Sequence, residues 1–178
     1  MSRSKAIAYT CAFVHAIATL LMATLLAPGL TGANRLAYIA SHRAAWVGSW
    51  IVWQFAAITL VTLYAVFSRY AAILGAIGAT IDITSEWRYI VDGPSRTLDI
   101  AIGGFANGFY SLALLVLLVM RRDLPRAMQR LGAFIVLCGL ALSAGSFIGN
   151  QQLEVVATAI LFPSVIVWAI LAGRCSAA

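Results

Sequence analysis

Long apolar stretches separated by short polar segments dominate this chain. A helix rises about 1.5 Å per residue, so about 20 apolar residues cross the hydrocarbon core of a bilayer. Six stretches reach this length when a few polar residues are tolerated, over residues 6–27, 44–67, 70–91, 98–120, 131–149 and 153–173. The pattern therefore predicts an all-α integral membrane protein: a compact bundle of six transmembrane helices forming a single membrane domain over residues 1–178.

The third stretch is the least apolar of the six. Its continuous apolar part runs from Ala71 to Ile81 and is too short to cross a bilayer alone. It becomes long enough only when Asp82, Glu86 and Arg88 are included. The alternative is five crossings plus a re-entrant segment, which would place the two termini on opposite sides of the membrane.

The distribution of basic residues favours six crossings. With six, the side that holds both termini carries eight basic residues: Arg3, Lys5, Arg69, Arg121, Arg122, Arg126, Arg130 and Arg174. The other side carries four: Arg35, Arg43, Arg88 and Arg96. Because Lys and Arg concentrate in cytoplasmic loops, we expect a multi-pass protein of the cell membrane with both termini in the cytoplasm.

Composition supports the membrane prediction and excludes other classes. The 178 residues are 62% hydrophobic and only 10% charged, with a mean hydropathy of +0.94. Soluble domains are about 25% charged, so a soluble enzyme, a disordered chain and a coiled coil are excluded. The net charge of +6 does not indicate nucleic acid, because the arginines lie between apolar runs and form no basic stripe. Cys11, Cys138 and Cys175 have no zinc or disulfide spacing.

Two carboxyl groups fall inside the third stretch. A charged carboxylate at bilayer depth costs roughly 2.5–3.5 kcal/mol, so Asp82 calls for a partner, solvent or a function. Glu86 lies one helical turn further on and on the same face. Gly75, Gly78, Asp82, Ser85 and Glu86 form one stripe, which predicts close helix packing at one end and a polar site at the other. A buried hydrogen-bond anchor at Asp82 is the simpler interpretation.

Other polar residues are expected near the outer half of the bundle. Trp50 and Gln54 fall in the second stretch and share this half with Glu86, Asp99, Asn150, Gln151 and Glu154, whereas Asp82 lies deeper. The tryptophans at 46, 50 and 53 share one helical face and form either an aromatic belt at the lipid headgroups or the wall of a cavity. Together these positions predict an outward-facing polar pocket.

His15 lies in the middle of the first stretch. A hydrogen-bonded packing role is the simplest interpretation, and a proton-responsive role is the alternative because histidine titrates near neutral pH. The only other histidine, His42, is expected at the outer interface, so a bis-histidine haem inside the bundle is not favoured. The sequence indicates no metal site and identifies no cofactor.

Three function classes follow from these positions. We expect the binding or transport of a small solute, a proton or a lipid. The candidate ligand-binding residues are Asp82, Glu86, Asn107, Gln54, His15, Trp50 and Glu154. The alternatives are an accessory or structural subunit of a larger membrane complex or a homo-oligomer, and a small intramembrane enzyme that uses carboxylate acid–base chemistry. No motif assigns a catalytic residue, and the expected surroundings are the lipid bilayer without nucleic acid.

Overall fold

The computed structural model describes residues 2–28 and 34–175, and every regular element in these ranges is helical. The elements are α1 (Arg3–Leu21), η1 (Met22–Leu26), α3 (Arg35–Ser41), α4 (Arg43–Phe67), α5 (Arg69–Asp92), α6 (Arg96–Asp99), η2 (Ile100–Ala106), α7 (Asn107–Met120), α8 (Arg126–Ile148) and α9 (Gln151–Cys175). The segments η1 and η2 are π-helices that continue α1 and precede α7. The predicted all-α class is therefore confirmed.

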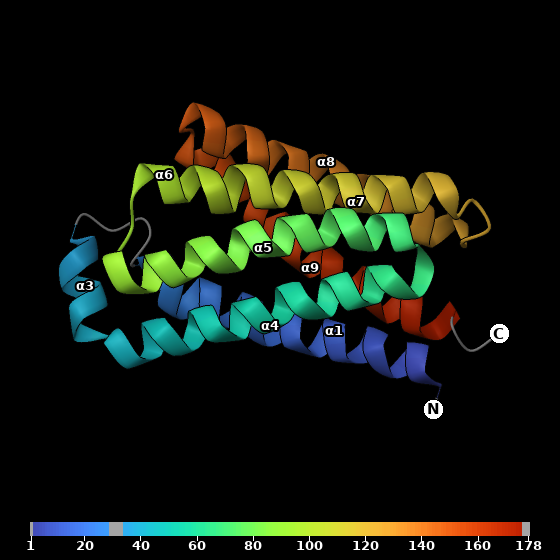
Figure 1. The fold of residues 1–178 in the computed structure, drawn as a ribbon, viewed down its shortest axis with the longest axis horizontal. Helices are drawn as coiled ribbons and strands as arrows, with labels where there is room; N and C mark the ends of the chain where they lie inside the picture. The colour runs from blue at the N-terminus through green and yellow to red at the C-terminus, as the bar shows by residue number, and fades with distance from the viewer. Residues whose placement is uncertain (1, 29–33, 176–178) are drawn as a thin grey trace.

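Six long rods arranged in a ring make up the bundle (Figure 1). Each rod packs against the next one along the chain: α1 against α4, α4 against α5, α5 against α7, α7 against α8, and α8 against α9. The contact between α9 and α1 closes the ring. Successive rods run in opposite directions, so α1 begins and α9 ends at the same end of the bundle, which we call the terminal end. The opposite end, which carries α3, is the α3 end.

Five of these rods are long and apolar enough to cross a membrane: Arg3–Leu26, Arg43–Phe67, Arg96–Met120, Arg126–Ile148 and Gln151–Cys175. This finding supports a multi-pass membrane protein. The third predicted stretch forms α5, a continuous helix of 24 residues, but α5 does not reach the same hydropathy. It runs alongside the other rods for the length of the bundle (Figure 1).

Short connections impose the alternating directions. Ser68 alone separates α4 from α5, and its hydroxyl accepts a hydrogen bond from the Ala71 amide as an N-cap. Between α8 and α9, Gly149 has a φ of 73°, a left-handed conformation that glycine adopts without a steric penalty. The next amide, of Asn150, donates to the Gly145 carbonyl at 2.9 Å. This connection reverses the chain within two residues, and α9 therefore packs back on α8.

The small-residue stripe predicted on the third stretch is buried along its whole length, at Gly75, Gly78, Asp82, Ser85 and Glu86. The space beside Gly78 is tight: a Cβ atom there would lie 3.0 Å from the Ala106 carbonyl oxygen. A similar approach joins η2 and α8, where the Ser143 hydroxyl donates to the Gly104 carbonyl at 2.7 Å. Small residues thus bring the backbones close together, as is typical of membrane helices.

The interior is divided along the axis of the bundle. Towards the terminal end lies an aliphatic cluster that includes Leu63, Leu114, Leu117 and Met128. Its largest ring, Trp168, is 1% exposed and donates from Nε1 to the Met128 carbonyl at 3.1 Å. Towards the α3 end lies a second cluster rich in aromatic rings, with Trp46, Trp50, Trp53 and Tyr89. The polar groups of the interior lie mostly between these two clusters and beside the second one.

Candidate functional site

A cavity of about 520 Å³ lies inside the ring at its α3 end, and we call it the end cavity. Six rods contribute to its lining. Its polar and charged lining residues are Thr19, Arg35, Arg96, Asp99, Asn107, Ser146, Gln151, Glu154 and Thr158. Its larger apolar and aromatic lining residues are Met22, Trp50, Trp53, Tyr89, Ile102, Leu142, Val155 and Phe162. The cavity therefore combines an apolar wall with several polar groups, as small-molecule sites commonly do.

Trp50 and Trp53 of α4 form an aromatic wall of the end cavity rather than a belt facing lipid, and Trp46 packs behind them against Trp50 and Tyr89. Trp46, Trp50 and Trp53 are only 1%, 2% and 9% exposed. Trp50 lies against Tyr89 with ring centroids 5.4 Å apart, and Trp53 lies against Phe162 at 4.5 Å. An interfacial belt requires rings at the outer surface of the bundle, so their burial favours the cavity-wall interpretation.

A charged and hydrogen-bonded group borders the end cavity. The Tyr89 hydroxyl donates to the Asp99 carboxylate and accepts from Arg35 at 3.2 Å. Arg35 and Asp99 are also ion-paired at 4.0 Å, and both side chains are about one third exposed (34% and 29%). This group joins α3, α5 and α6. A partly exposed ion pair contributes little to stability, about 1 kcal/mol or less. The main effect of this group is therefore to position α3, α5 and α6 relative to one another.

Two π-helical segments flank the end cavity. Met22 from η1 and Ile102 with Gly103 from η2 belong to its lining. A π-helix has a wider turn than an α-helix. At the end of η2 the Asn107 side-chain amide donates a hydrogen bond to the Ile102 carbonyl at 2.9 Å. Short π-helical segments inside longer helices occur frequently at functional sites. The sequence pattern predicted a regular helix over residues 98–120 and did not predict this π-helical segment.

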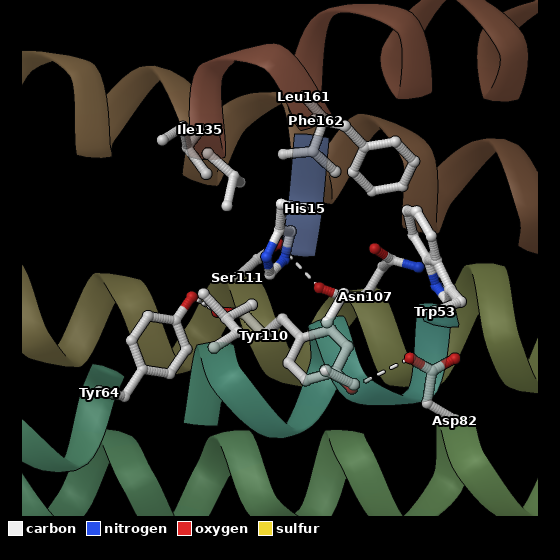
Figure 2. Close-up of a pocket in the computed structure, with 14 residues that line it drawn as sticks. His15, Trp53, Tyr64, Asp82, Asn107, Tyr110, Ser111, Ile135, Leu161 and Phe162 are labelled. Atoms are coloured by element: carbon white, nitrogen blue, oxygen red, sulfur yellow. Dashed lines mark hydrogen bonds between the residues drawn. The ribbon is translucent and has the colours of Figure 1, made fainter. Parts of the chain in front are cut away.

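A smaller inner cavity, of about 50 Å³, lies deeper in the ring (Figure 2). It shares Trp53, Asn107 and Phe162 with the end cavity, so the two spaces are neighbours along the bundle. Asp82 points into it from α5, and the Tyr110 hydroxyl donates to Asp82 Oδ2 at 3.0 Å (Figure 2). A cavity of this size holds a few water molecules when polar groups line it.

His15 lines the inner cavity and is hydrogen-bonded within its own helix. It is 5% exposed, and its Nδ1 atom lies 2.9 Å from the Cys11 carbonyl oxygen of the preceding turn. The Thr19 hydroxyl in turn donates to the His15 carbonyl at 2.7 Å. The simpler of the two predicted interpretations therefore fits its surroundings. Within the described residues no group of three His, Cys, Asp or Glu side chains could hold a metal ion.

Glu86 and Gln54 line neither cavity but lie between α5 and α4, close to each other. Glu86 is 0% exposed and Gln54 is 9% exposed. Among the described residues, neither Glu86 oxygen accepts a hydrogen bond of normal geometry. The Gln54 Nε2 atom donates none. Arg88, two residues further along α5, pairs with Asp92 at 3.6 Å and not with Glu86.

The structure thus divides the predicted site residues among three places. Trp50, Asn107 and Glu154 line the end cavity, His15 and Asp82 line the inner cavity, and Gln54 and Glu86 lie beside them. Sequence reasoning missed Tyr89 and Tyr110. Tyr89 lies three residues after Glu86 and Tyr110 three residues after Asn107, so the same helical spacing that grouped the polar residues could have found both.

No known protein family, curated protein or solved structure matches this chain.

Proposed function

We propose that this protein crosses the cell membrane six times and binds a small amphiphilic molecule, such as a lipid, in the end cavity. The sixth crossing is α5, whose charged groups lower its mean hydropathy without facing lipid at mid-length. Asp82 and Glu86 are turned into the bundle, and the Arg88–Asp92 pair lies at the last turn. The exposed large side chains of α5 are Tyr70, Ile73, Ile77, Trp87 and Val91. Its outer face is therefore suited to lipid although its average composition is not.

The basic residues supply an orientation for the six rods. The eight predicted on the side of the termini fall at or near the terminal end, including Arg121 and Arg122 in the connection between α7 and α8. Arg35, Arg43 and Arg96 lie at the α3 end. Because Lys and Arg concentrate in cytoplasmic loops, this excess of positive charge favours a cytoplasmic position for the terminal end. The end cavity then faces the outer side.

The lining of the end cavity is the observation that carries the proposed ligand class. Trp53, Ile102 and Phe162 offer an apolar surface, while Arg35, Arg96, Asp99 and Glu154 offer two positive and two negative groups. An apolar body with a polar head of balanced charge matches both parts of this lining. A volume of about 520 Å³ lies within the usual range for small-molecule sites.

Binding fits the structure better than conduction through a pore. The space inside the ring narrows from the end cavity to the inner cavity, and the aliphatic cluster with Leu63, Leu114 and Leu117 fills the bundle beyond it. Transport would require a second conformation in which these helices separate.

Native mass spectrometry of protein extracted gently from its own membrane tests the proposal. We expect an adduct of reproducible mass on a chain that contains no other polypeptide. Thr158 lines the end cavity, so Thr158→Trp should fill part of the space and remove the adduct. Ile160→Trp is the matched control on the same helix, because Ile160 is 43% exposed on the outer surface. An adduct kept at full occupancy in Thr158→Trp contradicts the proposal, as does a wild-type chain that carries none.

A further inference from the structure

The carboxyl groups of Asp82 and Glu86 form a buried acidic pair without a basic partner. They lie one turn apart on α5 and are 2% and 0% exposed. The ion pairs of the described residues are Arg35–Asp99, Arg88–Asp92 and Arg121–Asp123, and none of them includes either group. Two negative charges this close in an interior of low dielectric are strongly unfavourable, because each pays for lost hydration and they repel each other.

The carboxyl oxygens of the pair lack most of the hydrogen-bond donors that they could accept from. Asp82 Oδ2 accepts from Tyr110, but Asp82 Oδ1 and both Glu86 oxygens accept no hydrogen bond of normal geometry from the described residues. A polar group from another helix lies beside Glu86: Gln54 of α4 is nine-tenths buried and lies within reach of the Glu86 carboxyl group, but its Nε2 atom makes no hydrogen bond of normal geometry. Buried polar atoms are almost always satisfied, so this cluster is incomplete as a purely structural element.

A single positive charge would complete the cluster. A proton shared between two carboxyl groups removes their repulsion and supplies a donor. Sodium would take the carboxylate oxygens as ligands, together with the Gln54 side-chain oxygen after rotation of the amide and the Tyr110 hydroxyl oxygen. A calcium ion needs six to eight oxygen ligands, more than these four side chains offer without several waters. We infer that Asp82 and Glu86, with Gln54 and Tyr110, form a binding site for one monovalent cation, either a proton or sodium.

The inner cavity provides the approach to this site. Asp82 lines that cavity, and the cavity borders the end cavity through Trp53, Asn107 and Phe162. On the far side, Leu60 and the aliphatic cluster separate the site from the terminal end. A cation therefore reaches Asp82 from the α3 end. The inference does not depend on the amphiphile, because a chain that carries no adduct can still bind a cation at Asp82 and Glu86.

Several other titratable groups surround the pair and contribute to any pH-dependent change in the unfolding midpoint. They are Tyr64 from α4, Tyr110 from α7, His15 from α1 across the inner cavity, and Asp99 with Tyr89 and Arg35 towards the α3 end. A pH response of the wild-type protein alone is therefore insufficient. The response must disappear when Asp82 and Glu86 are neutralised.

The test uses the full chain in detergent micelles and follows its thermal unfolding midpoint. Sodium chloride is compared with choline chloride at equal ionic strength, and pH is varied separately without sodium. The variants are Glu86→Gln, which keeps the Tyr110–Asp82 hydrogen bond, and the double variant Asp82→Asn with Glu86→Gln. The control is Asp92→Asn, an exposed carboxyl change on the same helix.

If sodium is the ligand, it raises the midpoint of the wild-type and Asp92→Asn proteins above the value in choline. The apparent sodium affinity then falls by about tenfold or more in Glu86→Gln, equivalent to about 1.4 kcal/mol. If the proton is the ligand, sodium has no specific effect, and acidification raises the midpoint of the wild type, raises it less in Glu86→Gln and does not raise it in the double variant. The inference is overturned if Glu86→Gln and the double variant respond to sodium and to pH as the wild type does, or if the wild type responds to neither. Should the double variant not fold, Glu86→Gln alone decides between these results.

Discussion

Tyr110 of α7 donates a hydrogen bond to Asp82 of α5, with 3.0 Å between the phenol oxygen and Oδ2. This bond crosses the interface between two rods of the ring and is the only hydrogen bond that Asp82 accepts from the described side chains. It fixes one oxygen of the carboxyl group and leaves the other, Oδ1, without a hydrogen bond from the described residues. Asp82 is therefore both a packing residue and the most accessible member of the acidic pair.

Removing the Tyr110 hydroxyl should weaken the α5–α7 interface. Tyr110→Phe leaves a buried carboxyl group without its donor, so we expect the free energy of unfolding to fall by about 1–3 kcal/mol. Denaturant titration in detergent micelles measures this difference. Tyr70→Phe is the control, because Tyr70 lies on the same bundle but is 46% exposed, and its loss should have little effect. Equal losses for the two variants would contradict a specific role for the Tyr110–Asp82 bond.

Adding one methyl group to Gly78 should force α5 away from α7. The new Cβ would lie 3.0 Å from the Ala106 carbonyl oxygen and 3.1 Å from Phe109 Cβ, and a backbone atom cannot rotate aside. Overpacking of this kind costs about 1–3 kcal/mol, so Gly78→Ala should unfold more readily. Gly48→Ala is the matched control: no atom lies within 4 Å of its added Cβ, and alanine favours a helix over glycine by roughly 1 kcal/mol. A Gly78→Ala protein as stable as Gly48→Ala would show that the two helices are not held at this distance.

Six crossings can be separated from five by cysteine labelling on intact cells. In a chain without its native cysteines, Ser2→Cys and Ala127→Cys should be protected from a membrane-impermeant maleimide. Ser41→Cys and Gln152→Cys should react with it. If α5 re-entered without crossing, Ala127 and Gln152 would exchange sides while Ser2 and Ser41 kept theirs. That exchange is the result that would refute the sixth crossing.

The connection between α7 and α8 should show a pH-dependent ion pair. Two hydrogen bonds from Arg121, at 2.8 Å and 2.7 Å, lower the pKa of Asp123, with the fixed positive charge acting in the same direction. A carboxyl group whose pKa is lowered by folding stabilises the protein above its unfolded pKa, and this contribution is lost as the pH falls through the folded pKa.

We therefore expect Asp123→Asn to unfold at a slightly lower temperature than the wild type at neutral pH, and the difference to vanish in acid. The effect should be small because the Asp123 carboxylate is exposed to solvent. Thermal unfolding of both proteins across pH measures it. In an Arg121→Gln background the same Asp123→Asn change should have no pH-dependent effect. A difference that persists at low pH would point to a cause other than the ion pair.

The positions of the six rods and the stripe on α5 could be predicted from sequence because both are local properties. Apolar stretches of sufficient length, with polar residues, glycine and proline between them, place the helices within a few residues of those observed. The fifth stretch is the clearest difference, since α8 begins at Arg126 rather than at residue 131. Polar arginine and glutamine side chains continue the helix beyond its apolar part, because helix formation does not require burial at the ends.

The two π-helical segments and the partners of Asp82 and Glu86 could not be predicted in this way. Asn107 stabilises η2 through the Ile102 carbonyl, a contact five residues back that the regular α-helical spacing does not provide. Tyr110 reaches Asp82 only because α7 packs beside α5, and Gln54 reaches Glu86 only because α4 packs on the other side.

The sequence by itself determined that this chain forms long apolar helices and that one of them carries two acidic groups on a single face. It also determined that basic residues are more numerous at one end of the bundle than at the other. These properties follow from the order of residues within each segment. The tertiary structure alone decided that α9 closes on α1, that the tryptophans of α4 face inward, and that Asp82 and His15 line one cavity. These relationships depend on how the surfaces of separate helices fit together, and shape complementarity between distant segments is not encoded in the spacing within either one.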